Sequence, residues 1–407
     1  MKMKRNGAVF AVFLGALAAL PPIATDMALP ALTRIGAALG SSQAMAGMTL
    51  SLFMAGFALS PFFYGPQSDR HGRRPLLLIG LVLFAIGGVL ATFAPNMTVL
   101  LIARLLQGLG AGAGMTLAMA MVRDSFEGRV AQSRLAVITV VANTAPIVAP
   151  ALGTMVLGTM VLGEWGWRAI YAANAISGLL LLAMAVPALE ETVPAFNTAP
   201  KSLWRDYCQA LSHRSVLIHL LLNALAFGWM FAYVAGSPVV LIEHLHASPV
   251  LYTLLFACTG GGIVAGASLS GWLGQRGVAP LKLIFSAVLL AMLATVIAVL
   301  LSLSSAPSLF TLMPCLVLAT AAFGMLAPCA AQGALEPLPA LAGVTGGLLT
   351  SLQMAAGALA SLLVSVMLPT LGILGMTATM AGFAFLTLLL VLSLARAPAA
   401  RAVPLEN

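Results

Sequence analysis

Long apolar stretches, each long enough to cross a bilayer, follow one another along almost the whole chain. A transmembrane helix needs about 20 mostly apolar residues. This pattern predicts twelve spans, at residues 8–32, 44–65, 75–94, 98–122, 134–159, 165–187, 215–240, 249–273, 281–303, 307–332, 342–368 and 370–395. Lipid offers the backbone no hydrogen bonds, so a span must be a helix or part of a closed barrel. The unbroken apolar runs lack the alternation of barrel strands. An all-α membrane protein is therefore expected.

A polar stretch divides the predicted spans into two sets of six. Residues 1–189 are expected to form an N-terminal six-helix bundle and residues 215–396 a C-terminal one. A linker over 190–214 joins them, and residues 397–407 form a tail. Two sets of equal size are typical of transporters built from related halves.

A weak internal repeat agrees with two related halves. Gly65 and Arg70 at the end of the second span match Gly271 and Arg276 at the end of the eighth, whereas Asp69 is replaced by Gln275. Glycine and arginine are common at helix ends. The evidence for a repeat is therefore that the two matches occupy corresponding positions in the two halves.

Composition and charge support the membrane and predict an orientation. Hydrophobic residues make up 61% of the chain and charged residues 7%, whereas a soluble domain carries about 25% charged residues. Sixteen of the 19 Lys and Arg fall on one predicted side, and only Arg34 and Arg168 fall on the other. By the positive-inside rule, both termini and the linker are expected in the cytoplasm, which places the protein in a bacterial inner membrane. The net charge of +8 then needs no nucleic-acid partner.

The first apolar run could also be read as a secretory signal, because Lys2, Lys4 and Arg5 precede it. The run continues through Pro21 to Asp26, and similar runs follow it. A first transmembrane helix is the expected structure.

The loop between the second and third spans carries an acid among several cations. It reads Gly65-Pro-Gln-Ser-Asp-Arg-His-Gly-Arg-Arg-Pro75. An ordinary basic turn would explain the glycines and arginines, but the acid could pair with the cations or cap a helix. The stretch resembles the loop signature G-x-x-x-D-R-x-G-R-R of the major facilitator superfamily. The resemblance implies a fold of two six-helix bundles and a conformational latch formed by Gly65, Asp69, Arg70, Gly72, Arg73 and Arg74.

Two charged residues lie inside predicted spans, where a charge is costly unless it faces protein or water. Asp26 is the only acid placed within a span, and Arg104 is the only base placed some turns inside one. Asp26 could instead cap backbone at the membrane interface, and Arg104 could reach the interface along its alkyl chain. Leu101 to Gly112 resembles the fourth-helix motif of the superfamily, which implies that Arg104 takes part in proton coupling. A carboxylate held in a low dielectric is a natural proton carrier.

The fifth span carries Pro146, Pro150 and Gly153, which could be no more than a kinked packing helix. The stretch resembles the antiporter motif of drug exporters, although Ala149 stands where glycine is usual before the second proline. Three further stretches resemble the bicyclomycin/chloramphenicol-resistance exporters, at Thr25–Pro30, Gly236–Glu243 and Glu336–Gln353.

Four polar residues in apolar spans are candidates to line a substrate cavity, although packing and interhelical hydrogen bonds would also explain them. They are Asn143, Asn223, Tyr233 and Gln353.

These features together predict a proton-coupled exporter of small amphipathic drug-like compounds. It would work as a monomer by alternating access, with the proton gradient as its energy source and no metal or other cofactor. The chain has no catalytic motif or phosphate-binding loop. A proton-coupled importer of a small nutrient on the same fold remains an alternative, and a membrane-embedded sensor or enzyme is a more distant one.

Overall fold

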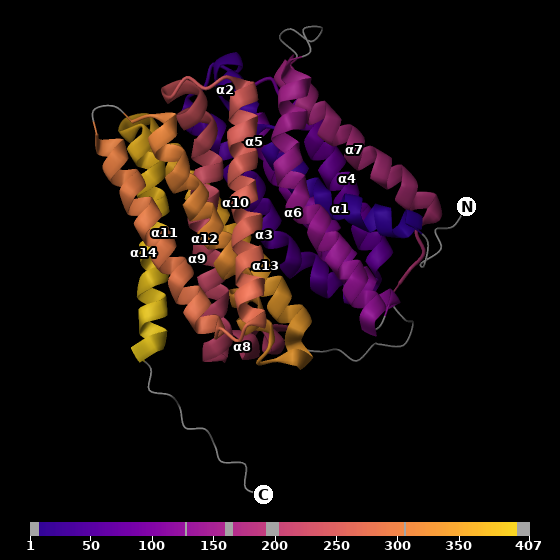
Figure 1. Cartoon of the computed structure of the whole chain (residues 1–407). Helices are drawn as coiled ribbons and strands as arrows, with labels where there is room; N and C mark the ends of the chain where they lie inside the picture. Colours follow the sequence, from indigo (N-terminus) through magenta and orange to yellow (C-terminus); the bar gives the residue numbers. More distant parts are fainter. Residues whose placement is uncertain (1–7, 127, 159–165, 193–202, 305–306, 397–407) are drawn as a thin grey trace, which may run out of the picture.

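The computed structural model describes residues 8–126, 128–158, 166–192, 203–304 and 307–396, and the secondary structure of these residues is helical (Figure 1). Twelve helical segments are long and apolar enough to cross a membrane. Their helices are α1 (Ala8–Asp26), α3 (Gln43–His71), α4 (Arg73–Thr92), α5 (Met97–Ser125), α6 (Gly128–Gly158), α7 (Gly166–Ala188), α9 (Arg214–Pro238), α10 (Pro249–Gln275), α11 (Pro280–Leu303), α12 (Leu309–Leu335), α13 (Ala342–Leu371) and α14 (Ile373–Arg396). The predicted number of spans is confirmed.

Shorter helices lie at the two ends of the bundle. A 3-10 turn, η1 (Leu29–Ala31), and helix α2 (Leu32–Ala38) follow α1, and helix α8 (Leu203–Ser212) precedes α9. A second 3-10 turn, η4 (Pro339–Leu341), precedes α13. Figure 1 shows α2 at the top of the bundle and α8 at the bottom. We call these the α2 end and the α8 end; the cytoplasmic location of the α8 end stays a prediction.

Three details differ from the sequence prediction. Helix α3, the second span, continues to His71 beyond its predicted end at residue 65. The polar residues after the apolar run continue its backbone hydrogen bonds. A π-helical turn, η3 (Val239–His244), extends α9, so that Glu243 lies within the candidate span. The prediction placed Asp26 as the only acid inside a span and the other acids in loops, at helix ends or in the tail, and Glu243 lies at the end of this helical segment. The linker, expected as a connection, contains the amphipathic helix α8.

Serine and asparagine side chains begin four of the helices that start at the α2 end. Ser42 caps α3, Asn96 caps α5, Ser248 caps α10 and Ser308 caps α12, and each side chain accepts a hydrogen bond from the backbone three residues on. Such caps satisfy donors that the first helical turn leaves free. The capped helices are the second and fourth spans of each half, so the same start signal recurs in both.

Glycines bring the same two pairs of helices close together. A side chain at Gly56 or Gly108 would strike the backbone of the partner helix where α3 crosses α5, and Gly266 and Gly324 occupy equivalent positions where α10 crosses α12. Small residues permit such close backbone approach in membranes, where dispersion drives helix association. The two halves therefore share glycines at corresponding helix crossings as well as capping residues at corresponding helix starts.

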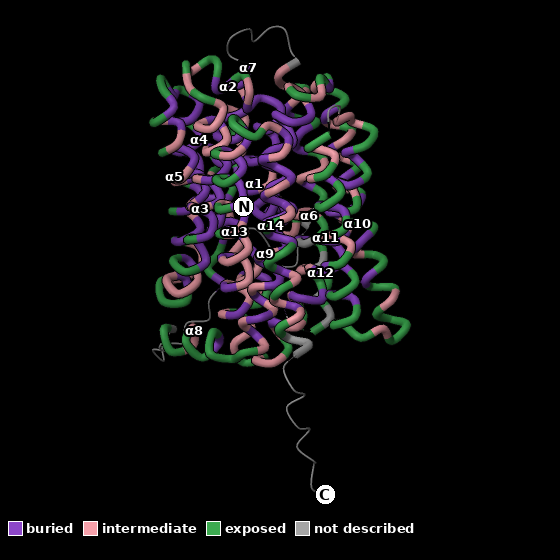
Figure 2. The backbone as a smooth tube through the Cα atoms, turned by 90° about the vertical axis from the view of Figure 1, so that its left-hand side faces the viewer, coloured by how far each residue is buried: buried purple, intermediate pink, exposed green. Residues whose placement is uncertain are grey.

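The interface between the halves is formed by long helix pairs. Helix α3 packs along α13, and α6 packs against α10. Figure 2 shows buried positions concentrated in the interior and exposed ones on the outer faces. Large apolar side chains such as Val12, Leu180 and Leu293 are among the exposed ones. A lipid solvent accounts for such outer faces.

We expect Gly108→Ala to destabilise the protein by about 1–3 kcal/mol, because the new methyl group would meet the carbonyl of Phe53 on α3. Thermal unfolding of the purified protein in detergent measures the effect. Gly261→Ala is the matched control, since a methyl group there would meet nothing within 4 Å. Equal unfolding midpoints for the two variants would contradict this account of the α3–α5 crossing.

Candidate functional site

Asp26 ends α1 inside the protein, with only 5% of its surface exposed. Helix α1 contains Pro21 and Pro22, which cannot donate backbone hydrogen bonds. The hydroxyl of Thr25 donates back to the carbonyls of both prolines at 3.1 Å, which ties down the turn that carries Asp26. The carboxyl therefore lies in a defined position away from the bulk solvent.

Arg104 lies fully buried on α5 and interacts electrostatically with Asp26. Its Nη1 donates to Oε1 of Gln107 at 2.5 Å. Its guanidinium carbon lies 4.4 Å from the ring centroid of Phe53 and 5.5 Å from that of Tyr171. Aromatic faces stabilise a cation that has left water. Arg104 thus faces protein, and the alternative in which it reaches the membrane interface is not what the structure shows.

The polar interior extends beyond this pair to α7. The buried atoms Nε and Nη2 of Arg104, Nε2 of Gln107, the hydroxyl of Tyr171 and Nδ2 of Asn174 have no hydrogen-bond partner among the described residues. Buried polar groups are normally satisfied by protein or ordered water. This region can therefore bind water or exchange protons.

Gln107, Tyr171 and Asn174 were missed by the sequence analysis. Gln107 lies three residues after Arg104, which puts both side chains on one helix face, so spacing alone could have indicated it. Tyr171 and Asn174 lie in an apolar span and carry no comparable signal. The position of Tyr171 beside Arg104 of α5 is a product of tertiary packing.

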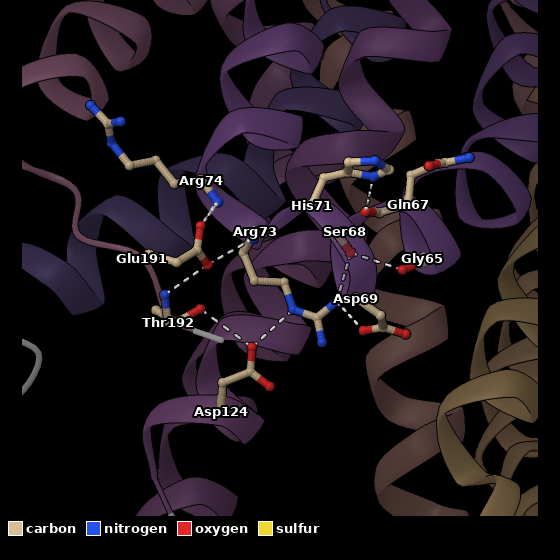
Figure 3. Close-up of polar contacts among 10 residues, drawn as sticks. All are labelled: Gly65, Gln67, Ser68, Asp69, His71, Arg73, Arg74, Asp124, Glu191 and Thr192. Atoms are coloured by element: carbon tan, nitrogen blue, oxygen red, sulfur yellow. Dashed lines mark hydrogen bonds and ion pairs between the residues drawn. The ribbon is translucent and has the colours of Figure 1, made fainter. Parts of the chain in front are cut away.

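The loop between α3 and α4 forms a network of charges in the N-terminal half (Figure 3). Arg73 pairs with Asp69 at 2.5 Å, and its Nε donates to Asp124 at the end of α5 at 2.9 Å. Its Nη1 also donates to the hydroxyl of Ser68 at 2.6 Å. Arg73 therefore connects the ends of three helices.

Glu191 completes this network from the segment after α7. Its carboxylate accepts hydrogen bonds from the backbone nitrogens of Arg73 at 2.8 Å and Arg74 at 3.1 Å. A carboxylate at a helix N-terminus satisfies free donors and complements the helix dipole. Gly72 has a φ of 94°, and a side chain there would meet this carboxylate. The sequence analysis missed Asp124 and Glu191, since acids at a helix end and in a polar stretch are common.

Among the described residues, the hydrogen bonds and ion pairs of Arg73 and Arg74 join α3, α4, α5, α7 and the segment just after α7. Arg70 is exposed. The linker helix α8 packs against α3 near this network. The ring centroid of Tyr207 on α8 lies 5.5 Å from that of Phe62 on α3. Burial, and secondly the negative charge of Asp69, raise the pKa of Tyr207. A latch between the halves stays a prediction.

The residues predicted to line a substrate cavity lie in different parts of the structure. Nδ2 of Asn223 on α9 donates to Oε1 of Gln353 on α13 at 3.1 Å, so these two are brought together. Tyr233 is buried, with its hydroxyl 2.9 Å from that of Thr259. The side chain of Asn143 lies outside the described residues. The structure thus gives Asn223, Gln353 and Tyr233 interhelical hydrogen-bonding roles, whatever else they do.

Helix α6 contains Pro146 and Pro150 and lies against the turn after Asp26. A side chain at Gly153 would strike the carbonyl of Met27, so glycine permits this approach. A hollow of about 370 Å³ lies beside the same helix. It is lined by Ile23 of α1 and by Val140, Val141, Thr144, Ala145, Val148, Ala149 and Leu152 of α6. Among the described residues, no three His, Cys, Asp or Glu side chains gather as a metal site requires.

Hydrogen bonds hold the halves together toward the α2 end. Gln43 at the start of α3 donates to Glu243 of η3. Ser51 donates to Ser361 of α13 at 2.9 Å, and the hydroxyls of Thr154 and Thr253 lie 2.9 Å apart. Rocking of one half against the other in an alternating-access carrier would break and re-form contacts of this kind.

Twelve apolar helices in two packed halves, with a buried acid–base pair, define a membrane transporter. Residues 13–361 match the family model of the Major Facilitator Superfamily. The chain belongs to this superfamily, whose members are transporters and not enzymes.

Two relatives are each 32% identical to the chain. One is an uncharacterized MFS-type transporter, YdgK of Bacillus subtilis (strain 168), aligned over 92% of this chain and 94% of its own length. The other is the multidrug resistance protein MdtL of Shigella flexneri serotype 5b (strain 8401), aligned over 60% of this chain and 61% of its own.

Solved structures show the same fold. A D-xylose-proton symporter matches with a TM-score of 0.73 over 95% of this chain and 97% of its own. An inward-facing, occupied bacterial homologue of the human lysosomal transporter Spinster matches with a TM-score of 0.77 over 97% and 98%. Both are 16% identical, so the likeness concerns the fold alone.

We expect Gly72→Ala to lower the free energy of unfolding by about 1–3 kcal/mol, because its backbone conformation is almost restricted to glycine. The methyl group would also displace the Glu191 carboxylate from the start of α4. Thermal unfolding measures the loss. Gly65→Ala, in the same motif but with open space around it, is the control and should unfold as the parent does. A Gly72→Ala midpoint equal to that of the control would refute the role given to this glycine.

Proposed function

We propose that the protein exports small amphipathic drug-like compounds in exchange for protons, as a transporter of the bicyclomycin/chloramphenicol-resistance type. The burial of a carboxyl group, Asp26, and a guanidinium group, Arg104, within apolar helices is the observation that carries this proposal. The proton gradient supplies the energy, and no metal or other cofactor takes part. One chain holds both halves and the whole charged site, so that a monomer is sufficient.

Asp26 is suited to carry the exchanged proton. Removal from water disfavours the charged form of a carboxyl group relative to its neutral form. Arg104 stabilises the charged form, while burial favours the neutral one. The balance between these effects changes when the site opens to water. Such a group can bind a proton on one side of the membrane and release it on the other.

The hollow beside α6 is suited to an apolar substrate. Ile23 lines it and lies three residues before Asp26, so both side chains lie on one face of α1. Hydrophobic walls discriminate poorly between similar molecules. A carrier with such walls next to a proton site would accept a range of compounds. The name of the relative MdtL is that of a multidrug resistance protein, which agrees with this substrate class.

The predicted latch has a definite place in the proposed cycle. Asp69, Arg73 and Arg74 join α3, α4 and α7, while Tyr207 of the linker helix packs against Phe62 of α3. Contacts of this network that exist in one conformation and not the other would bias which end of the carrier is closed. Pro146, Pro150 and Gly153 would shape α6 so that it follows these movements.

We expect drug-driven proton release from everted membrane vesicles with an imposed proton gradient, measured with a pH-sensitive dye during a screen of antibiotics. Asp26→Asn should reduce the release to background, because an amide cannot carry the proton. Asp206→Asn, which removes a carboxylate from the linker helix, should behave as the parent does. Undiminished release in Asp26→Asn would exclude Asp26 as the coupling group. If no compound moves protons, the antiport proposal itself is wrong.

A further inference from the structure

The linker helix α8 is tied closely to the start of a transmembrane helix. Only His213 separates its last residue, Ser212, from the first residue of α9. The backbone of His213 is extended, and its Nδ1 accepts a hydrogen bond from the nitrogen of Val216 at 3.4 Å, which caps α9. The chain therefore changes direction between the two helices. Figure 2 shows α8 at the lower edge of the bundle, on the side where α3 lies.

The contacts of α8 place it at the level of the membrane surface. Tyr207 packs with its ring centroid 5.5 Å from that of Phe62, which lies near the end of the apolar run over 44–65. Ala210 of α8 is buried in a small apolar cluster with Val216 and Leu220, which belong to the first two turns of α9. The helix therefore lies against the ends of apolar runs and does not extend away from the bundle into water.

A second apolar face of α8 has no protein over it among the described residues. Trp204, Cys208 and Leu211 follow at intervals of four and three residues, which places them on one face of the helix. All three are exposed, and the Trp204 side chain is 78% exposed. Exposed apolar patches mark sites that bind protein or membrane. Tryptophan in particular is enriched where a bilayer meets water.

The remaining face of α8 is polar. Arg205, Gln209 and Ser212 are exposed and repeat at the same intervals, about a third of a turn further round the helix than the apolar face. Arg214 is also exposed, at the start of α9. A helix that lies on a bilayer has apolar residues toward the acyl chains and basic or polar residues toward the head groups and water. Arginine also binds phosphate groups well, and every phospholipid carries one.

We propose that α8 docks on the phospholipid leaflet at the α8 end of the bundle. Trp204, Cys208 and Leu211 lie among the upper acyl chains, and Arg205 and Arg214 lie at the lipid phosphates. The level of the Phe62 contact favours lipid over a soluble protein as the partner of this face, because lipid surrounds the apolar runs at that level. The proposal is independent of the transported compound and of the proton.

Docking would have a consequence for the two halves. Through Tyr207 the helix contacts α3 of the N-terminal half, and it packs against α9 and α13 of the C-terminal half. The leaflet would therefore hold at its surface a helix that touches both halves.

Spin labelling tests this position in the full-length protein in phospholipid nanodiscs. The label is attached to the native Cys208 after Cys258, Cys315 and Cys329 have been replaced by serine or alanine. Oxygen concentrates among acyl chains, whereas a water-soluble nickel chelate is excluded from them. The label at residue 208 should therefore collide with oxygen more often than with the chelate. In the matched control the label is at Gln209→Cys, with Cys208 replaced by serine, and the preference should reverse.

Hydrogen–deuterium exchange gives a second measurement on chains that keep all their native cysteines, so it does not depend on how the labelled variants fold. In nanodiscs, Trp204→Gln should speed amide exchange across residues 203–212 about tenfold, because the helix loses its largest apolar contact with lipid. Gln209→Ala, on the polar face, is the control and should exchange as the parent does.

Two results would overturn the proposal. One is a label at residue 208 that meets the nickel chelate as often as a label at 209, which would place the apolar face in water or against a soluble partner. The other is parental exchange in Trp204→Gln, which would mean that the bundle alone holds α8. Neither measurement involves a drug or a proton gradient, so failure of the antiport proposal shows only in the vesicle assay.

Discussion

Lipid provides a polypeptide with no hydrogen-bonding partners, and the architecture of this transporter depends on that constraint. Each span must satisfy its own backbone, which requires helices, and each helix must begin with its free donors satisfied. Ser42 and Ser248 perform this task at corresponding helices of the two halves. Glycines such as Gly108 and Gly324 then let pairs of helices approach until their backbones touch, since dispersion is the force that remains.

The same constraint explains why protein surrounds the two charged residues inside the bundle. A carboxyl and a guanidinium group inside the bundle are costly unless protein surrounds them, so Asp26 and Arg104 lie among Thr25, Gln107 and two aromatic rings. The closed α2 end keeps water from this centre through contacts such as that of Ser51 with Ser361. In the proposed function, opening that end would expose the carboxyl group to water and so change its affinity for protons.

Much of the site could be predicted because charge inside an apolar run is visible in one dimension. Asp26 and Arg104 were identified in this way, as was Asp69 among its cations. Glu191 could not be identified, because it binds residues more than a hundred positions away and acids in polar stretches are common. Asn223 and Gln353 were chosen separately for a cavity, and the structure shows that they bond to each other.

The amino-acid sequence by itself determined the membrane location, the twelve spans, the division into halves of six and the superfamily signature. These properties depend on hydropathy and on short motifs, which act over one helix or one turn. Only the tertiary structure decided that Glu243 lies in the helical extension of α9, that the linker forms a helix whose Tyr207 packs against Phe62, and that Asn223 bonds to Gln353. Such facts depend on which helix faces pack together, and packing of apolar surfaces against one another is set by shape over the whole bundle.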